Sequence, residues 1–541
     1  MFRNATRSLI GAAALLLSAF SLQDPLARAL ETIRARELRA HLYFLSHDRL
    51  EGRATASRGG AIAAAYIATQ LMRAGAEPIQ GTHLQPVPLI GVAAYAAGTT
   101  LSFGTPRGSL SARSGDDVVL WSQAETPQPE SEGELVFVGY GVDAPEYDWN
   151  DFEGQDLTGK VVLVLVGDPP APPEEPELFD GRRLTYFGRW NYKVEQAEQR
   201  GAVGVLLVHT PESAGYGWNV VRSSWTGEQL GLPRAAGAPP ALAFRGWITW
   251  QHAHDVLGAA GADLDALHVA AARRDFRPVA TGIRVRARVP SRVRRLQSVN
   301  VVGMLPGSAP DLRGEFVLFT AHYDHLGIGP PVQGDSIYNG AYDNASGVSV
   351  LLELADAFAR LEPRPARSLV FLATTAEEDG LLGAEHYVRN PLVPIEQTVA
   401  VINIDGANLW GETNDIAALG ASRSTLGRVL ERRAAELGMR VVGDRAPELG
   451  FFFRSDHFPF ARAGVPALLL QPGIDYRNRP PGWGARLLAR YDRRDYHSPG
   501  DEYEAGFDLS GAVQQARLTA AVGYDVATDP RRPQPYRSPL R

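Results

Sequence analysis

Short apolar segments alternate with amphipathic segments from about residue 297 to residue 525, and this alternation constrains the fold more than any other feature. Buried strands are predicted at five places: 300–304, 316–320, 368–373, 399–404 and 467–470. Helices are predicted at four places: 347–360, 383–389, 424–437 and 509–526. This order is typical of an α/β fold with a mostly parallel central sheet flanked by helices. Ligands bind such sheets beyond the carboxyl ends of the strands, so the side chains there are the candidates for function.

The rest of the chain differs in texture. Since 541 residues exceed one ordinary core, we expect two or three domains. Residues 30–100 begin with helical patterning. Residues 101–290 hold short apolar runs separated by glycine, proline and acidic residues, which predict a β-rich insert without a catalytic constellation of its own. A second α/β unit follows at 297–528, and the proline- and arginine-rich tail, 529–541, is predicted to be mobile.

The charge balance argues against a nucleic-acid partner. The net charge is −7 and the pI is about 6.0. The one basic segment, 283–289, alternates apolar residues with arginines and is followed by three more arginines. Alternation with a period of two predicts a strand with one solvated face that bears arginines, rather than a phosphate-binding patch.

The first 29 residues are typical of a secretory signal peptide. Arg3 and Arg7 precede the apolar stretch 9–22, and 27–29 reads Ala-Arg-Ala, a small-x-small cleavage site. The stretch is short for a membrane span, although an uncleaved anchor is the alternative. We therefore expect an exported protein, periplasmic or extracellular, with no transmembrane anchor after cleavage. Because the chain has no cysteine, any metal site must use nitrogen and oxygen ligands.

Glu377 and Glu378 stand side by side where the apolar run that starts at Phe371 breaks into a loop. Adjacent carboxylates at a strand end can divide two tasks, because one can bind a metal while the other moves protons. The alternative is the acidic first turn of a helix, which the helix macrodipole favours.

Four other segments place acidic residues or histidines near predicted strand ends or in a loop. Each has an ordinary structural alternative: a surface pair, a helix cap, a turn before glycine, or a surface loop. If His322 binds a metal, its second ring nitrogen must be held, and Asp324 is suitably close in sequence. The residues are His322, Asp324 and His325 after 316–320, Asp343 before 347–360, Asp405 after 399–404, and His497 before 509–526.

Together these residues predict a two-metal site. Two histidines and three carboxylates supply one shared bridge and two terminal ligands for each metal, and they leave Glu377 unligated. Two divalent cations would polarise a carbonyl oxygen and lower the pKa of a water molecule toward about 7. The free glutamate would then accept the proton of that water and pass it to the departing amine.

At this point the chain resembles the co-catalytic dizinc aminopeptidases, whose relatives include glutamate carboxypeptidases and glutaminyl cyclases. The motifs cover most of 30–95 and 297–525: Ala321-His-Tyr-Asp-His-Leu-Gly, Asp343-Asn-Ala-Ser-Gly, Ala376-Glu-Glu-Asp-Gly, Asn403-Ile-Asp, Ser455-Asp-His and Tyr496-His-Ser-Pro-Gly-Asp. The insert resembles a protease-associated domain at about 130–275, through Gly139-Tyr-Gly and Leu157-Thr-Gly-Lys. The resemblance implies a zinc-peptidase-like fold of the phosphorylase/hydrolase-like type, with 30–100 as the first part of the peptidase domain.

The family also implies a role for each matching residue. Asp343 would bridge two metal ions, most simply Zn²⁺, although such ligands also accept Co²⁺ or Mn²⁺. Glu378 and His497 would complete one site and His322 and Asp405 the other, with Glu377 as the acid/base. Secondary candidates are Tyr496, which would polarise the scissile carbonyl, and Asp456 and His457, which have no assigned role.

These implications predict an exported aminopeptidase that acts on peptides or proteins, and three alternatives stay open. A carboxypeptidase for acidic C-termini would need an arginine cluster, for which Arg389, Arg454 and Arg462 are candidates. A glutaminyl cyclase would use one zinc ion, whereas the presence of both His322 and Asp405 favours two. A non-catalytic binding protein usually lacks part of the ligand set, which is complete here.

Overall fold

The computed structural model describes residues 24–127 and 130–536. Most of the predicted signal peptide and the end of the tail, 537–541, lie outside the described residues. The predicted cleavage site, 27–29, lies in helix α2 (Pro25–Thr32), whose Leu26 and Ala29 are buried. Among the described residues, no helix combines the length and the apolar character needed to cross a bilayer.

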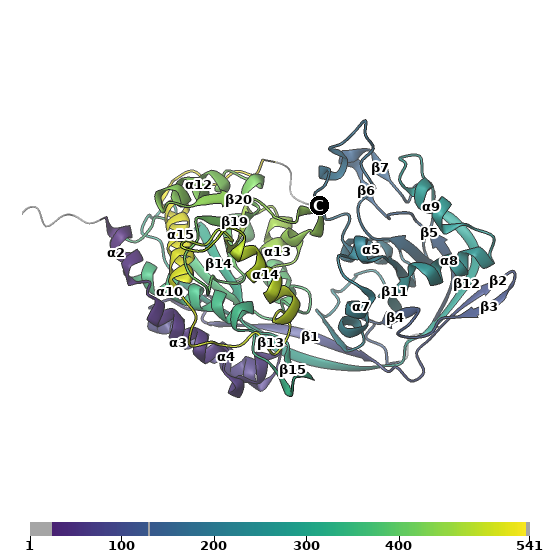
Figure 1. Cartoon of the computed structure of the whole chain (residues 1–541), viewed down its shortest axis with the longest axis horizontal. Coiled ribbons are helices and arrows are strands. Elements are labelled where there is room, and N and C mark those ends of the chain that lie inside the picture. Colours follow the sequence, from purple (N-terminus) through teal and green to yellow (C-terminus); the bar gives the residue numbers. More distant parts are fainter. Residues whose placement is uncertain (1–23, 128–129, 537–541) are drawn as a thin grey trace, which may run out of the picture.

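A nine-stranded sheet forms the centre of the larger half of the molecule (Figure 1). Its four middle strands are parallel, and antiparallel strands flank them on both sides. The predicted α/β fold with a mostly parallel centre is therefore confirmed. The strand order is β10 (Glu228–Gly231), β1 (Leu84–Ala94), β13 (Ser291–Leu305), β17 (Ser368–Thr374), β14 (Phe316–His322), β18 (Thr398–Ile404), β21 (Ala467–Pro472), β19 (Asp415–Leu419) and β20 (Arg440–Val442).

Helices cover both faces of this sheet, because side chains alternate between two cores. On β14, Phe319 belongs to one core and the adjacent Leu318 to the other. One core is shared with α2, α3 (Ala35–Leu45), α4 (Arg58–Arg73), α10 (Gly347–Ala359), α12 (Leu426–Glu436) and α15 (Ser510–Thr528). The other core is shared with α11 (Leu382–Arg389) and α13 (His457–Arg462). Helix α14 (Trp483–Arg494) precedes the loop that carries His497.

The insert contains a second sheet, of eight strands. Its four central strands, β5, β8, β9 and β11, are parallel. The order is β3 (Gly108–Ser111), β2 (Thr100–Thr105), β12 (Val279–Arg288), β5 (Glu130–Phe137), β8 (Val161–Leu165), β9 (Gly204–His209), β11 (Phe244–Thr249) and β4 (Val118–Trp121). The arginine-bearing face predicted for 283–289 is observed in β12, where Arg284 and Arg286 pair with Glu132. The main helices are α5 (Trp190–Gln199), α6 (Pro211–Ala214), α7 (Trp218–Trp225), α8 (Trp250–Ala259) and α9 (Leu264–Ala271).

Two long antiparallel strands join the two halves. Strands β1 and β13 pair from Leu84 and Val301 to Ala94 and Ser291, and Figure 1 shows them running from the first sheet toward the insert. Strand β10 of the insert returns to this sheet and pairs with β1. The insert therefore contributes one strand, β10, to the sheet that carries the predicted ligands.

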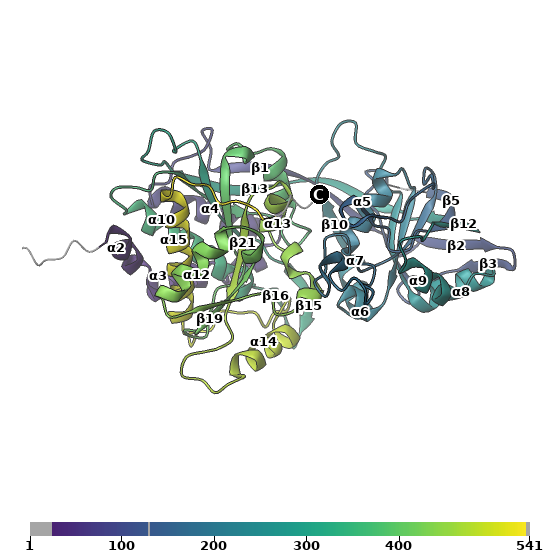
Figure 2. The ribbon, with the colours of Figure 1, turned by 90° about the horizontal axis from the view of Figure 1, so that it is seen from above.

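A shared aromatic core also joins the halves. The ring of Tyr186 in the insert lies 4.9 Å from the ring of Phe458 in α13, and both belong to one buried cluster with Phe452 and Phe453. The backbone N–H of Leu184 donates a hydrogen bond to the carbonyl of Pro447. Figure 2 shows α5 and α7 beside α13 from above, as Figure 1 does from the side.

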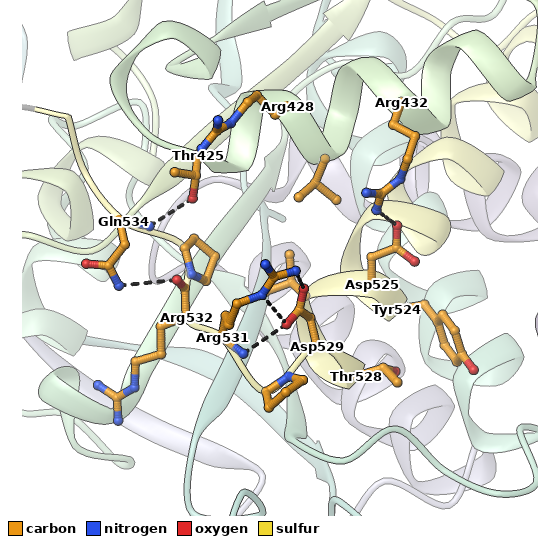
Figure 3. A pocket seen from close by; sticks show the side chains of 14 residues that line it. Thr425, Arg428, Arg432, Tyr524, Asp525, Thr528, Asp529, Arg531, Arg532 and Gln534 are labelled. Carbon is orange, nitrogen blue, oxygen red and sulfur yellow. Dashed lines mark hydrogen bonds and ion pairs between the residues drawn. The ribbon is translucent and has the colours of Figure 1, made fainter.

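The first part of the predicted mobile tail is hydrogen-bonded to the domain. The Gln534 N–H donates to Thr425 Oγ1 over 2.9 Å, and the Thr425 N–H donates to the Gln534 carbonyl. Arg532 pairs with Glu315 at 2.7 Å. Figure 3 shows this segment beside α12, where the two line a groove of about 1200 Å³. Composition had suggested mobility, whereas these contacts fix residues 529–536 to the fold.

Candidate metal centre

The five predicted ligands meet at the carboxyl ends of the parallel strands. His322 is the last residue of β14, and Asp405 follows β18 directly. Glu378 lies in the loop after β17, and Asp343 lies in the turn before α10. His497 comes from the loop after α14. The sheet topology thus brings together residues up to 175 positions apart in the sequence, from 322 to 497.

Asp343 stands at the centre of the cluster, between the two histidines. Its Oδ1 lies 3.1 Å from His322 Nε2, and its Oδ2 lies 3.5 Å from His497 Nε2. On the far side, His322 Nε2 lies 3.3 Å from Asp405 Oδ1, and His497 Nε2 lies 3.1 Å from Glu378 Oε2. The two carboxylate oxygens of Asp343 therefore serve two neighbouring nitrogen–oxygen clusters, which is the arrangement of a bridging ligand.

The donor atoms fit divalent metal ions. The Nε2 of His497 is buried and makes no hydrogen bond of acceptable geometry, although it points at two carboxylates. Two overlapping groups have ligand atoms within 4.8 Å of one another: His322, Asp343 and Glu378, and His322, Glu377 and Asp405. Imidazole and carboxylate ligands suit zinc and other divalent first-row metals.

Glu377 lies against this cluster and is almost fully buried. Burial raises the pKa of its carboxyl well above the usual range, and the neighbouring charges of Asp405 and Glu378 act in the same direction, against His322. Among the described residues, none forms a hydrogen bond with the side-chain carboxylate of Glu377. A buried carboxyl without a fixed partner is suited to exchange protons with a substrate.

Asp324 holds His322 differently from the simplest expectation. The Nδ1 of His322 lies 3.1 Å from the backbone carbonyl of Asp324, not from its carboxylate. The carboxylate instead accepts hydrogen bonds from Thr375 Oγ1 at 2.5 Å and the Ala376 N–H at 2.6 Å. Asp324 therefore fixes both the histidine ring and the loop that carries the two glutamates.

Two contacts that the sequence did not predict orient the outer carboxylates. Ser455 Oγ donates to Asp405 Oδ2 over 2.6 Å and accepts from Asn403 Nδ2 over 2.7 Å. His325 Nδ1 lies 2.8 Å from Glu378 Oε1, so this histidine contacts a predicted ligand. Partners of this kind fix the rotamer of a metal-binding side chain. The motif around Ser455 was recognised, but strand order alone does not show which carboxylate it meets.

The backbone around Asp343 is held by two buried charges. Asp501 accepts hydrogen bonds from the N–H groups of Tyr342 and Asp343, at 2.8 and 3.0 Å. Arg53, which is fully buried, donates to the carbonyls of Tyr323, Asn339 and Gly340, among others. The site therefore contains a buried protein cation, Arg53, next to the loops that carry its carboxylates.

The secondary candidates separate into two classes. Tyr496 is half exposed and stacks on His497 with ring centroids 3.9 Å apart. Asp456 is buried and accepts a hydrogen bond from Thr374 Oγ1, and His457 is buried with its ring edge-on to Phe452 at 4.8 Å. Among the described residues, no recorded hydrogen bond or ion pair joins Asp456 or His457 to the five ligands. Tyr496 therefore stacks on a predicted ligand, whereas Asp456 lies near enough to influence the charges of His322 and Glu377 without contacting a ligand.

Comparison with known families decides where this domain belongs. The model of peptidase family M28 matches residues 300–522, a span that contains all five ligands and Glu377. We call residues 300–522, which match this family model, the M28 domain. The match supports the predicted resemblance to metal-dependent peptidases for this part of the chain, whereas the number of metal ions stays a prediction.

Relatives of the M28 domain carry related names. Leupeptin-inactivating enzyme 1 of Streptomyces exfoliatus is 31% identical over 176 residues, which are 31% of this chain and 38% of that protein. A probable zinc metalloprotease of Pyrenophora teres f. teres is 41% identical over 107 residues, 19% of this chain and 22% of that protein. The chain thus spans well under half of the length of these relatives.

One solved structure resembles the whole chain. The aminopeptidase from Aneurinibacillus sp. strain AM-1 aligns with a TM-score of 0.53 over 95% of this chain and 98% of that one, at 19% identity. At this identity the likeness concerns the fold, and it extends beyond the M28 domain to the insert.

Proposed function

We propose that the chain is an exopeptidase that removes N-terminal residues from peptides with the help of two divalent cations. The observation that carries this proposal is Asp343, whose two oxygens each face a different histidine. Each histidine in turn faces one further carboxylate, Asp405 or Glu378. This symmetry supplies equivalent ligand sets on both sides of one bridge, and the name of the Pyrenophora relative favours zinc.

The residues suggest a division of labour. His322 and Asp405 would hold one cation, His497 and Glu378 the other, and Asp343 both. Bound cations would supply Lewis acidity toward the scissile carbonyl and lower the pKa of the attacking water. Glu377 accepts a proton from this water as the new C–O bond forms, and donates it to the leaving nitrogen as the C–N bond breaks. Tyr496 is placed to donate a hydrogen bond to the carbonyl oxygen.

Chelation tests the metal requirement. Treatment of the full chain with a chelator should abolish hydrolysis of aminoacyl anilides, and added Zn²⁺ should restore it. Metal analysis alongside should find about two equivalents per chain in the active form. Turnover that survives complete metal removal would exclude the mechanism.

A second experiment distinguishes removal of N-terminal residues from removal of C-terminal residues. An aminopeptidase should hydrolyse peptides with a free N-terminus and leave N-acetylated peptides intact, with the N-terminal residue as the first product. Release of C-terminal residues from the acetylated peptides would instead identify a carboxypeptidase.

We further propose that residues 1–29 direct export and that the insert is a protease-associated domain that shapes access to the centre. The insert packs against α13 (Figures 1 and 2). This helix begins two residues after Ser455, which contacts the proposed ligand Asp405. N-terminal sequencing of the exported protein should find a chain that starts at residue 30.

A further inference from the structure

Two arginines without a carboxylate partner meet between the insert and the M28 domain. Arg189 directly precedes α5 of the insert, and Arg454 directly precedes Ser455 of the M28 domain. Among the described residues, no ion pair joins either guanidinium to a carboxylate. Burial, and then the neighbouring charge of Arg454, lower the pKa of Arg189 to about 9, so Arg189 is a cation at neutral pH. Arginine side chains are generally protonated in proteins, and we treat Arg454 as a second cation. Two like charges without a counter-charge are costly, and an anion between them would offset that cost.

Hydrogen-bond donors around the two arginines lack acceptors. Arg454 uses Nη2 to reach the Leu449 carbonyl at 2.7 Å, but its Nε is buried and has no partner. The hydroxyl of Tyr216 is also buried without a partner. Both arginines act to lower the pKa of this hydroxyl, so Tyr216 lies in their neighbourhood. The N-terminus of α5, ten residues long, begins beside Arg189. A helix N-terminus together with free cationic donors favours an anion.

The two arginines border a small cavity that both halves of the molecule line. Its lining includes Gly188, Arg189, Trp190, Gly215, Leu449 and Arg454. The cavity volume is about 10 Å³, roughly the room of one water molecule. This room suits the terminal oxygen of a carboxylate rather than a whole phosphate group. Two exposed carboxylates, Glu212 and Glu448, also border it, and would disfavour groups with more than one negative charge.

The cavity lies close to the metal centre. Arg454 is adjacent to Ser455, whose Oγ lies 2.6 Å from Asp405 Oδ2. The phenol of Tyr496, stacked on His497, is near enough to influence the charge of Arg454. The predicted ligand His497 and Arg454 therefore share Tyr496 as a neighbour.

We propose that Arg189 and Arg454 form a subsite for a carboxylate of the peptide substrate, away from the scissile bond. This inference rests on the proposed peptidase function and specifies which peptides that function prefers. The carboxylate would accept hydrogen bonds from Arg454 Nε and from the Arg189 guanidinium, both of which border the cavity. It belongs either to the C-terminus of a short peptide or to an acidic side chain. Of the three candidate arginines for acidic specificity, Arg389 pairs with Glu385 and Arg462 pairs with Glu195, which leaves Arg454.

Three peptides distinguish the two sources of the carboxylate. Leu-Gly-Gly offers a terminal carboxylate, Leu-Gly-Gly-amide offers none, and Leu-Gly-Glu-amide offers only an acidic side chain. For the zinc-loaded wild-type chain, we expect KM to be about ten- to a hundredfold lower for at least one carboxylate peptide than for the neutral amide, as one or two charged hydrogen bonds would provide. Equal KM values for all three would overturn the proposal without any variant.

Substitutions then locate the effect. Arg189→Met and Arg454→Met should raise KM for the preferred carboxylate peptide toward that of the neutral peptide and leave the neutral peptide unchanged. Arg222→Met, an exposed arginine on α7 of the same insert, is the matched control. Arg454→Lys keeps the charge but loses the planar fork, so it should recover part of the effect if Arg454→Met folds poorly. Equal losses for charged and neutral peptides would assign the arginines a structural role and overturn the subsite.

Binding without turnover separates this proposal from the proposed function. Calorimetry on Glu377→Gln should give tighter binding of the preferred carboxylate peptide than of its amide, and Arg189→Met added to this background should remove the difference. If the wild-type chain hydrolyses no peptide but shows this preference in binding, the peptidase function fails while the anion subsite stands. If hydrolysis is normal and the preference is absent, the reverse holds.

Discussion

At the scale of single residues, two neighbouring glutamates occupy opposite environments. Glu378 faces His325 and His497, and despite its burial these histidines hold the pKa of its carboxyl at about 2. Glu377 is buried without such contacts, and its pKa is raised. Titratable neighbours whose environments separate their pKa values typically divide acid and base roles. The backbone turn after β17 makes this possible, since it points consecutive side chains in different directions.

Glu377→Gln should separate metal binding from catalysis. The amide keeps the size of the side chain but cannot accept the proton of the attacking water, so kcat should fall by about 10²- to 10⁴-fold. Metal content, measured by emission spectroscopy, should stay at the wild-type level. The exposed Glu431→Gln is the control. Near-normal turnover in Glu377→Gln would remove Glu377 from its role.

Ser455→Ala tests the hydrogen bond that orients Asp405. Loss of this contact should weaken the affinity for zinc by about ten- to a hundredfold, because the carboxylate is no longer held in its binding rotamer. Competition with a chromophoric chelator measures the affinity directly. Ser223→Ala on the exposed surface of α7 is the control. Unchanged zinc affinity would show that Asn403 and the strand end position Asp405 without the serine.

At the scale of elements, the sequence predicts what periodicity encodes. The strands 316–320, 368–373 and 399–404 are observed as β14, β17 and β18 within about two residues at each end, because continuous apolar runs are typical of buried parallel strands. The convergence of the ligands follows from that order. Helix α14 was not predicted, because its buried positions are few: Gly484 and Tyr491.

Contacts between loops that are distant in the sequence could not be predicted from the sequence. The pairing of Ser455 with Asp405, of His325 with Glu378 and of Arg53 with the carbonyls near Asp343 depends on loop conformations that no local pattern specifies. Arg189 and Arg454 lie 265 positions apart, in halves whose relative placement the sequence does not give. The motifs therefore predict the ligands, whereas only the structure shows which side chains surround them.

A buried carboxyl after β8 gives the insert a distinct pH dependence. Asp168 accepts two hydrogen bonds from Thr185, both 2.7 Å long, but burial raises its pKa to about 6. This value lies above about 3.9, the usual pKa of an unfolded aspartate. The stability that Asp168 contributes is therefore present below about pH 3.9 and is lost as the pH rises through about 6.

Asp168→Asn should remove the contribution of Asp168 to the pH dependence of the free energy of unfolding. Between about pH 4 and pH 6, the wild-type free energy of unfolding should decline with pH relative to that of the variant. Tryptophan fluorescence during urea unfolding reports on the insert, because seven of the nine tryptophans lie between residues 100 and 290. Asp265→Asn, at an exposed position of α9, is the control. Parallel profiles for wild type and Asp168→Asn would contradict the assignment.

At the scale of the whole molecule, the two halves share one sheet and one aromatic core. Phe458 of the M28 domain contacts Tyr186 of the insert, and Arg462 pairs with Glu195 of α5. An interface of buried aromatic rings resembles a domain core more than a mobile contact. We therefore expect the insert and the M28 domain to unfold together.

Phe458→Ala tests this cooperativity. In the wild type, far-UV circular dichroism and tryptophan fluorescence should report a single, coincident urea transition. The variant should lose about 3–5 kcal/mol, and its fluorescence transition should separate from the dichroism transition. Val269→Ala, an exposed position of the insert, should behave as the wild type. Two separate transitions in the wild type would show that the halves are independent.

Strand β10 closes the outer side of the catalytic sheet, because residues 228–231 of the insert pair with Ala93 to Ile90 of β1. Excision of residues 95–290 would remove β10 and leave β1 as an exposed edge strand, with unpaired backbone N–H and C=O groups near Leu89 and Val92. Exposed edge strands can pair with strands of other molecules. A truncated catalytic fragment should accordingly self-associate through β1, and light scattering would reveal it as a larger assembly than the intact chain forms under the same conditions.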